Sequence, residues 1–212
     1  MRETASELQR NLLENTMVAA HHLIWTIYGA WLPNDPRGSS STEIRADILK
    51  ELGEIHYGRK KIQPNSAVIR RFYQKAEPKL KHEVLPLSEE DLVIVAESFA
   101  HTIKARNYTC YGCAIMPDHV HLCIRKHRDK AEEMIAFFQD DSWQRIHEAK
   151  RWPNGHPIWG GPGWKVFLDS REDIERTIRY IRRNPIKAGL AEQVFEFVQD
   201  YDGWLPGIGT AK

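Results

Sequence analysis

The stretch that decides the fold is Ala114-Ile-Met-Pro-Asp-His-Val-His-Leu-Cys-Ile124. Its apolar run predicts a β-strand, on which His119 and His121 point to the same face because side chains alternate along a strand. Two imidazoles side by side on a rigid element can hold one divalent metal ion, and neutral imidazole is the commonest protein metal ligand. The alternative is a purely structural pair of histidines.

A helix further along the chain carries a tyrosine that lies off its apolar stripe. The stripe comprises Ile174, Ile178 and Ile181. At about 100° per residue, Tyr180 lies well over 90° from the centre of this stripe, so it is not simply another core aromatic. The alternative is a boundary tyrosine with a solvated hydroxyl.

Asn184 follows Tyr180 by four residues and shares its face if the helix extends that far. Pro185 lacks an N–H group and disfavours helical geometry in the preceding residue, so we expect the helix to end near Arg183. Asn184 is then alternatively a C-cap residue. Taken together, the histidine pair and a lone tyrosine among basic residues suggest metal-assisted phosphoryl transfer, with tyrosine as the nucleophile.

Basic residues form two clusters, although the net charge of the chain is only +1. A local phosphate-binding face is one interpretation, and an ordinary solvated surface is the other. Tryptophans in and beside a glycine-rich loop could stack on unpaired bases or belong to the core. The candidate DNA-binding cations are Arg125, Lys126 and Arg128 after the histidine strand, and Arg176, Arg179, Arg182, Arg183 and Lys187 on or near the helix; the tryptophans are Trp152, Trp159 and Trp164.

The order of the expected elements predicts an α+β fold. Strand, helix, strand, strand, helix, strand, helix is close to a split βαβ pattern, with helices packed on one face of an antiparallel sheet. We expect one domain over 1–212, with an irregular elaboration at about 33–87 that holds two short helices, and a short helix or loose arm over 1–16. The expected strands cover 20–28, 108–115, 119–124 and 164–168, and the expected helices cover 88–106, 130–149 and 170–183.

The bulk composition indicates an ordinary soluble protein, with 42% hydrophobic and 28% charged residues among 212. No apolar run approaches the roughly 18 residues of a membrane span, and the polar start lacks the apolar region of a signal peptide. Three cysteines, an odd number in apolar company, favour reduced thiols and a cytoplasmic protein without a membrane partner. Cys110 and Cys113 should point to opposite faces of a strand and therefore not chelate a metal.

Two stretches, 114–122 and 179–190, together resemble the single-tyrosine HUH transposases, most of all the REP-associated tyrosine transposases of bacteria. Supporting matches begin at His22-Leu-Ile-Trp-Thr26 and cover most of the chain. The resemblance implies a ferredoxin-like, HUH endonuclease-type core. In that core His119 and His121 would bind the metal with help from Asn184, and Tyr180 would be the nucleophile.

The resemblance also implies a cofactor, Mg²⁺ or Mn²⁺, and a reaction. The chain would cut and rejoin single-stranded DNA near palindromic hairpins through a 5′-phosphotyrosine, in the bacterial cytoplasm at the nucleoid, as a monomer or homodimer. Two departures stand out: relatives commonly have histidine where this chain has Arg182, and residues 33–87 exceed what compact members need. The rival interpretations are a DNA- or RNA-hairpin-binding protein that no longer cuts, and a nicking enzyme of replication or transfer.

Overall fold

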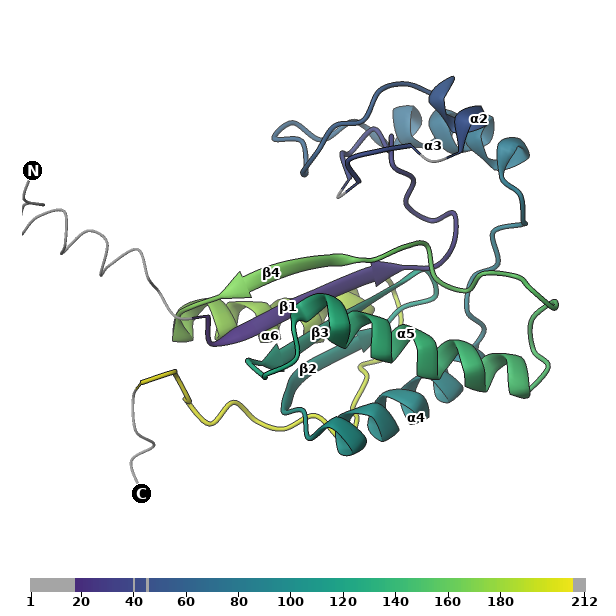
Figure 1. Cartoon of the computed structure of the whole chain (residues 1–212). Helices are drawn as coiled ribbons and strands as arrows, with labels where there is room; N and C mark the ends of the chain where they lie inside the picture. Colours follow the sequence, from purple (N-terminus) through teal and green to yellow (C-terminus); the bar gives the residue numbers. More distant parts are fainter. Residues whose placement is uncertain (1–17, 40, 45, 208–212) are drawn as a thin grey trace, which may run out of the picture.

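Four strands form one antiparallel sheet in the order β2-β3-β1-β4 (Figure 1). The computed structural model describes residues 18–39, 41–44 and 46–207, so the helix or arm expected over 1–16 lies outside the described residues. The strand order and the succession β1-α4-β2-β3-α5-β4 define a ferredoxin-like split βαβ arrangement, which confirms the predicted α+β fold. The elements are β1 Ala20–Thr26, α4 Glu89–Arg106, β2 Cys110–Ile115, β3 His119–Arg125, α5 Ala131–Glu148, β4 Trp164–Leu168 and α6 Arg171–Lys187.

The sheet is covered on both faces. The crossover helices α4 and α5 pack on one face, where Leu23 and Trp25 of β1 join the larger apolar cluster, so the expected packing of the helices on one face holds for these two and not for α6. Helix α6 packs on the opposite face, over β2 and β3, through its apolar stripe. Side-chain alternation therefore sends the apolar residues of β3 into the larger core, and it sends His119 and His121 to the α6 face.

Helix α6 extends beyond its expected end near Arg183, because Pro185 lies within the last turn of the helix. The proline removes the one hydrogen bond that its missing N–H would have made to the preceding turn. The turn is closed instead by the amide of Leu190, which donates to the carbonyl of Pro185 at 2.9 Å. The helix ends before Gly189, whose φ of +77° favours glycine.

A β-bulge corrects the expectation for the two neighbouring cysteines. The β2–β3 register shifts between Cys110 and Gly112, so one extra residue reverses the alternation of the strand. Cys110 and Cys113 consequently both contribute to the cluster under α4 and α5 rather than pointing to opposite faces. Both thiols are buried and free, and burial raises the pKa of Cys110 to about 12, as suits structural thiols.

The elaboration forms a layer beyond the β4 edge of the sheet (Figure 1). It contains α2 Asp47–Lys50, α3 Ser66–Ala76 and the 3-10 turn η1 Glu77–Lys79. The layer has a small apolar cluster of its own and is tied to the end of β1 by the Tyr73 hydroxyl, which donates to the carbonyl of Ala30 at 2.8 Å. In the described part of the chain, no helix is long and apolar enough to cross a bilayer.

Replacement of Phe138 by alanine tests the core. Phe138 is fully buried, and its ring lies 5.0 Å from Phe99 and 6.1 Å from Trp25 between ring centroids. Phe138→Ala should lower the free energy of unfolding in urea by about 3–5 kcal/mol, because it removes apolar contacts and leaves a cavity. Val166→Ala on the exposed side of β4 is the control and should change stability by less than about 0.5 kcal/mol. Equal losses in the two variants would contradict this core.

Candidate active site

Three histidines meet on the α6 face of the sheet. The antiparallel register opposes Ile24 to His121 and His22 to Cys123, so His22 of β1 is the diagonal neighbour of His121 on the same face. The two rings lie 5.0 Å apart between centroids, and His22 Nε2 is 3.0 Å from His121 Nδ1. The ring of His119 lies 4.9 Å from that of His121.

His119 is held between a carboxylate and an amide. Its Nδ1 lies 2.6 Å from Asp118 Oδ1, and its Nε2 lies 3.4 Å from Asn184 Nδ2. The hydrogen bond from His119 is the largest cause of the lowered pKa of Asp118. If Nδ1–H donates to the Asp118 carboxylate, the lone pair of His119 stays on Nε2, on the side of α6. A carboxylate on the far nitrogen is the usual partner of a metal-binding histidine.

His121 and His22 are neutral because they are buried. Burial, followed by the charges of His22 and His119, lowers the pKa of His121 to about 2, and burial lowers the pKa of His22 to about 4. Only one proton fits between their facing nitrogens. When His121 Nδ1–H donates to His22 Nε2, the lone pair of neutral His121 lies on its Nε2 and is free to bind a cation.

Tyr180 contacts this cluster from α6 while its side chain stays open to solvent. Its ring centroid lies 5.4 Å from that of His121 and 6.0 Å from that of His22, yet 44% of the residue is exposed. Lys187 Nζ lies 5.8 Å from the same ring centroid. Tyr180 is therefore not a core aromatic. A surface pocket beside it is lined by Asp118, His119, Asn184 and Lys187, among others.

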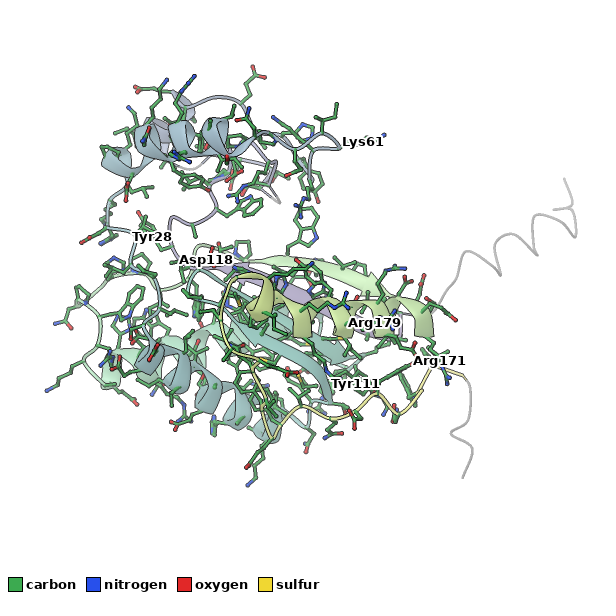
Figure 2. All side chains as sticks on the ribbon, turned by 180° about the vertical axis from the view of Figure 1, so that it is seen from behind. Tyr28, Lys61, Tyr111, Asp118, Arg171 and Arg179 are labelled. Atoms are coloured by element: carbon green, nitrogen blue, oxygen red, sulfur yellow. The ribbon has the colours of Figure 1, made fainter. Side chains whose placement is uncertain are left out.

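The helix that carries Tyr180 also places Asn184 at the site. Because α6 continues to Lys187, Asn184 lies one turn beyond Tyr180 on the same face and reaches His119. Figure 2 shows α6, marked by Arg171 and Arg179, lying across the sheet, with Asp118 at one end of it. The structure thus brings together the four side chains that the sequence singled out, namely His119, His121, Tyr180 and Asn184.

The donor set for a cation is two imidazoles and an amide. Among the described residues, no group of three or more His, Cys, Asp or Glu side chains is arranged to hold a metal ion. Asp118 is hydrogen-bonded to His119, and His22 to His121. These two partners fix ring orientation, while the outer nitrogens and the Asn184 amide are the groups that could contact an ion. Such a nitrogen and oxygen set suits a divalent ion of borderline or hard character.

The candidate DNA-binding cations are spread along the α6 face rather than gathered at Tyr180. The cations after β3 lie at the far end of that strand, about 20 Å from His119 at roughly 3.3 Å per residue. Lys126, Arg183 and Lys187 have no acidic partner among the described side chains. The other five are paired: Arg125 with Asp202, Arg128 with Asp129, Arg176 with Asp173, Arg179 with Glu175, and Arg182 with Asp200.

His22 is the site residue that the sequence did not single out. Its strand is separated from the histidine strand by about a hundred residues, so no spacing rule links them. The signal lies in the topology, because a split βαβ fold places β1 beside β3. Side-chain alternation along β1 then points His22 to the face that α6 covers.

Two of the three tryptophans considered for base stacking serve the fold. Trp152 is 7% exposed, and Trp159 donates its Nε1–H to Ser142 Oγ at 3.0 Å while packing against the larger core. Trp164, on β4, is half-buried and lies beside the exposed ring of Tyr57, 6.4 Å between centroids. Only Trp164 of the three remains a candidate for contact with a base.

No protein-family profile matches the chain, and no curated protein is similar to it in sequence. Among solved structures, the chain is similar to a REP-associated tyrosine transposase bound to a REP hairpin, at 10% identity and a TM-score of 0.43, over 92% of this chain and 91% of that one. It is also similar to a candidate transposase from Deinococcus radiodurans R1, at 12% identity and a TM-score of 0.40, over 82% of this chain and 92% of that one. Both structures come from the class of protein that the motifs resemble. With TM-scores below 0.5, neither likeness argues for a function, so the function is inferred from the geometry of the site.

Because His22 and His121 are neutral in the folded state, we expect the free energy of unfolding of the metal-free protein to depend on pH. His22 and His121 have lowered pKa values in the folded state, whereas their unfolded counterparts titrate near 6.5. The unfolded state therefore binds more protons below about pH 6.5, and the free energy of unfolding should fall with falling pH, down to about pH 4 for His22. The slope should reach up to about 1.4 kcal/mol per pH unit for each histidine.

Urea unfolding in EDTA at several pH values measures this slope. His22→Gln should flatten it between about pH 6.5 and 4, because one of the two groups no longer titrates. Val93→Ala, which changes an exposed residue of α4 without a titratable group, serves as the control and should leave the slope as in the wild type. An unchanged slope in His22→Gln would contradict a neutral, buried His22.

Proposed function

We propose that this protein is a metal-dependent tyrosine transposase that cleaves and rejoins single-stranded DNA near hairpins. The observation that carries the proposal is the position of Tyr180, which packs against His121 and His22 yet is 44% exposed, one helical turn from Asn184 and its contact with His119. A core tyrosine would be buried, and a boundary tyrosine with a solvated hydroxyl would need no cation-binding group beside its ring. A tyrosine placed for chemistry needs an open hydroxyl beside a cation-binding group, and this arrangement provides one.

The chemistry conserves the energy of the phosphodiester. The Tyr180 hydroxyl oxygen forms a bond to a backbone phosphorus, and the bond from that phosphorus to the 3′ oxygen breaks. The proton of the Tyr180 hydroxyl passes to solvent. A proton from solvent joins the departing oxygen to give a free 3′-hydroxyl. Attack by a 3′-hydroxyl on the 5′-phosphotyrosine reverses the step and joins DNA without another energy source.

The site residues fit a divalent ion, Mg²⁺ or Mn²⁺, which would be held by His119, His121 and Asn184. When bound, such an ion stabilises negative charge on the attacked phosphate. The protein's own part is positioning: Asp118 and His22 keep the two imidazoles in the tautomers that present a lone pair, and α6 places Tyr180 at a fixed distance from them. Lys187, beside the Tyr180 ring, adds positive charge where the phosphate would lie.

The chief rival is a hairpin-binding protein that no longer cuts. It explains the basic residues along α6, but it leaves the partly exposed tyrosine and the ordered imidazoles without a purpose. The two functions differ in one observable, which is a covalent bond between protein and DNA.

Tyr180→Phe should abolish a protein–DNA adduct while leaving DNA binding within a few-fold, because only the nucleophilic oxygen is removed. The measurement is a denaturing gel of protein incubated with labelled hairpin oligonucleotides and Mg²⁺ or Mn²⁺, with EDTA in a parallel lane. Tyr201→Phe is the matched control, since the Tyr201 hydroxyl donates to the carbonyl of Trp204 at 2.9 Å and belongs to neither the histidine cluster nor the basic clusters. Adduct that persists in Tyr180→Phe, or binding without adduct across a broad oligonucleotide set, would favour the rival.

His22 is proposed as a positioning residue for His121. Titration of metal-free protein with Mn²⁺, followed by electron paramagnetic resonance, should show binding lost in His119→Ala and weakened about 10- to 100-fold in His22→Leu, which removes the acceptor for His121 Nδ1–H. His22→Gln should recover much of the affinity because its amide oxygen can accept the same proton. Wild-type affinity in His22→Leu would show that His121 needs no such partner.

A further inference from the structure

We propose that the loop 57–61 and the neighbouring Trp164 form a binding surface for single-stranded DNA that flanks the cleavage site. This inference rests on the proposed function. It gives the α2–α3 layer the role of binding the single strand, and compact folds of this topology do not require that layer. It uses none of the cations that the sequence singled out on β3 and α6.

The charge of the layer is the first support. Residues 33–87 contain eleven Lys and Arg against seven Asp and Glu, a charge of +4 in a chain whose total is +1, and the part over 59–81 holds eight of these cations with the single acid Glu77. Lys79 pairs with Glu51, but the remaining cations of 59–81 have no carboxylate partner among the described residues. Positive charge without a protein partner, concentrated in one segment, is the signature of a surface that meets phosphates. The unpaired cations are Arg59, Lys60, Lys61, Arg70, Arg71, Lys75 and Lys81.

An aromatic pair beside these cations is the second support. Tyr57 is 67% exposed, and its ring lies 6.4 Å from that of Trp164 on β4, tilted by 32°. An exposed tyrosine whose ring lies near a second, half-buried ring offers an apolar surface, and Arg59 and Lys61 follow Tyr57 by two and four residues in the chain. Bases of a single strand stack on such rings, whereas the base pairs of a duplex hide their faces.

The loop is held in place rather than loosely attached. The amide of Gly58 donates to the carbonyl of Ser39 at 2.8 Å, and the amide of Lys60 donates to the carbonyl of Arg37 at 2.9 Å. Gly58 also adopts a φ of +81°, which favours glycine at the turn. Arg37 is in turn fixed by two hydrogen bonds to Asp35, at 2.6 and 2.8 Å, and lies over the Trp31 ring. A fixed surface binds with a smaller entropic cost than a mobile one.

The same anchor places the loop near the proposed site. The amide of Ile27, just beyond β1, donates to the carbonyl of Asp118 at 3.0 Å, and a few residues further on the Trp31 Nε1–H donates to the carbonyl of Gly38 at 2.8 Å. Figure 2 shows Asp118 at the end of the sheet that faces the layer, with Lys61 in the layer above it. Helix α6 lies over β2 and β3, so the side of the sheet toward β4 and Trp164 is where a strand could leave Tyr180 and reach the loop.

Fluorescence anisotropy of metal-free protein in EDTA tests the surface without any cleavage. The probes are a labelled thymidine 30-mer and a labelled duplex of equal length. Tyr57→Ala should weaken binding of the single strand about tenfold through lost stacking, and Tyr57→Phe should bind like the wild type. Arg59→Ala/Lys61→Ala should reduce the slope of log K against log salt by about 1.4, at about 0.7 for each lost phosphate contact.

Lys104→Ala/Arg106→Ala is the matched control, since it removes one lysine and one arginine that are exposed at the end of α4. It should bind both probes as the wild type does. Wild-type affinity in both loop variants, or losses equal for single strand and duplex, would overturn the proposal. The adduct assay separates the two claims: adduct with unaffected loop variants leaves only the proposed function, and impaired single-strand binding without any adduct leaves only this surface.

Discussion

The pairing of β1 with β3 is the constraint on which the site depends. Its register sets His22 diagonal to His121 and places both on the face that α6 covers, 3.0 Å apart between facing nitrogens. A shift of one residue would send either histidine into the core beneath α4 and α5. The larger apolar cluster on that other face holds the register, because the same shift would remove Leu23 and Trp25 from it.

Helix α6 turns this arrangement of histidines into a candidate catalytic site. Its isoleucine stripe packs on the sheet, which fixes the rotation of the helix and leaves Tyr180 at the boundary between core and solvent. Because the helix continues past Arg183, Asn184 stays on its surface and reaches His119. The two imidazoles have different partners, a carboxylate for His119 and a histidine for His121, and both partners act on the ring nitrogen that faces away from the proposed ion.

The order of elements and the faces of β3 and α6 could be predicted from the sequence, because strong alternation, helical spacing and the Ser88 and Ser170 caps are local signals. Three features could not. The role of His22 depends on a contact across 99 positions, the shared face of Cys110 and Cys113 depends on a bulge, and the end of α6 depends on closing bonds made after Pro185. The first two are set by pairing between strands, and the third by hydrogen bonds that form only once the chain turns after the proline.

The measurement that tests the account most directly is mass spectrometry of peptides from protein trapped with hairpin DNA and Mn²⁺. We expect a nucleotide attached through its 5′ phosphate to the peptide that contains Tyr180, and a free 3′-hydroxyl on the released strand. A nucleotide on any other residue, or cleaved DNA with no peptide attached, would contradict it.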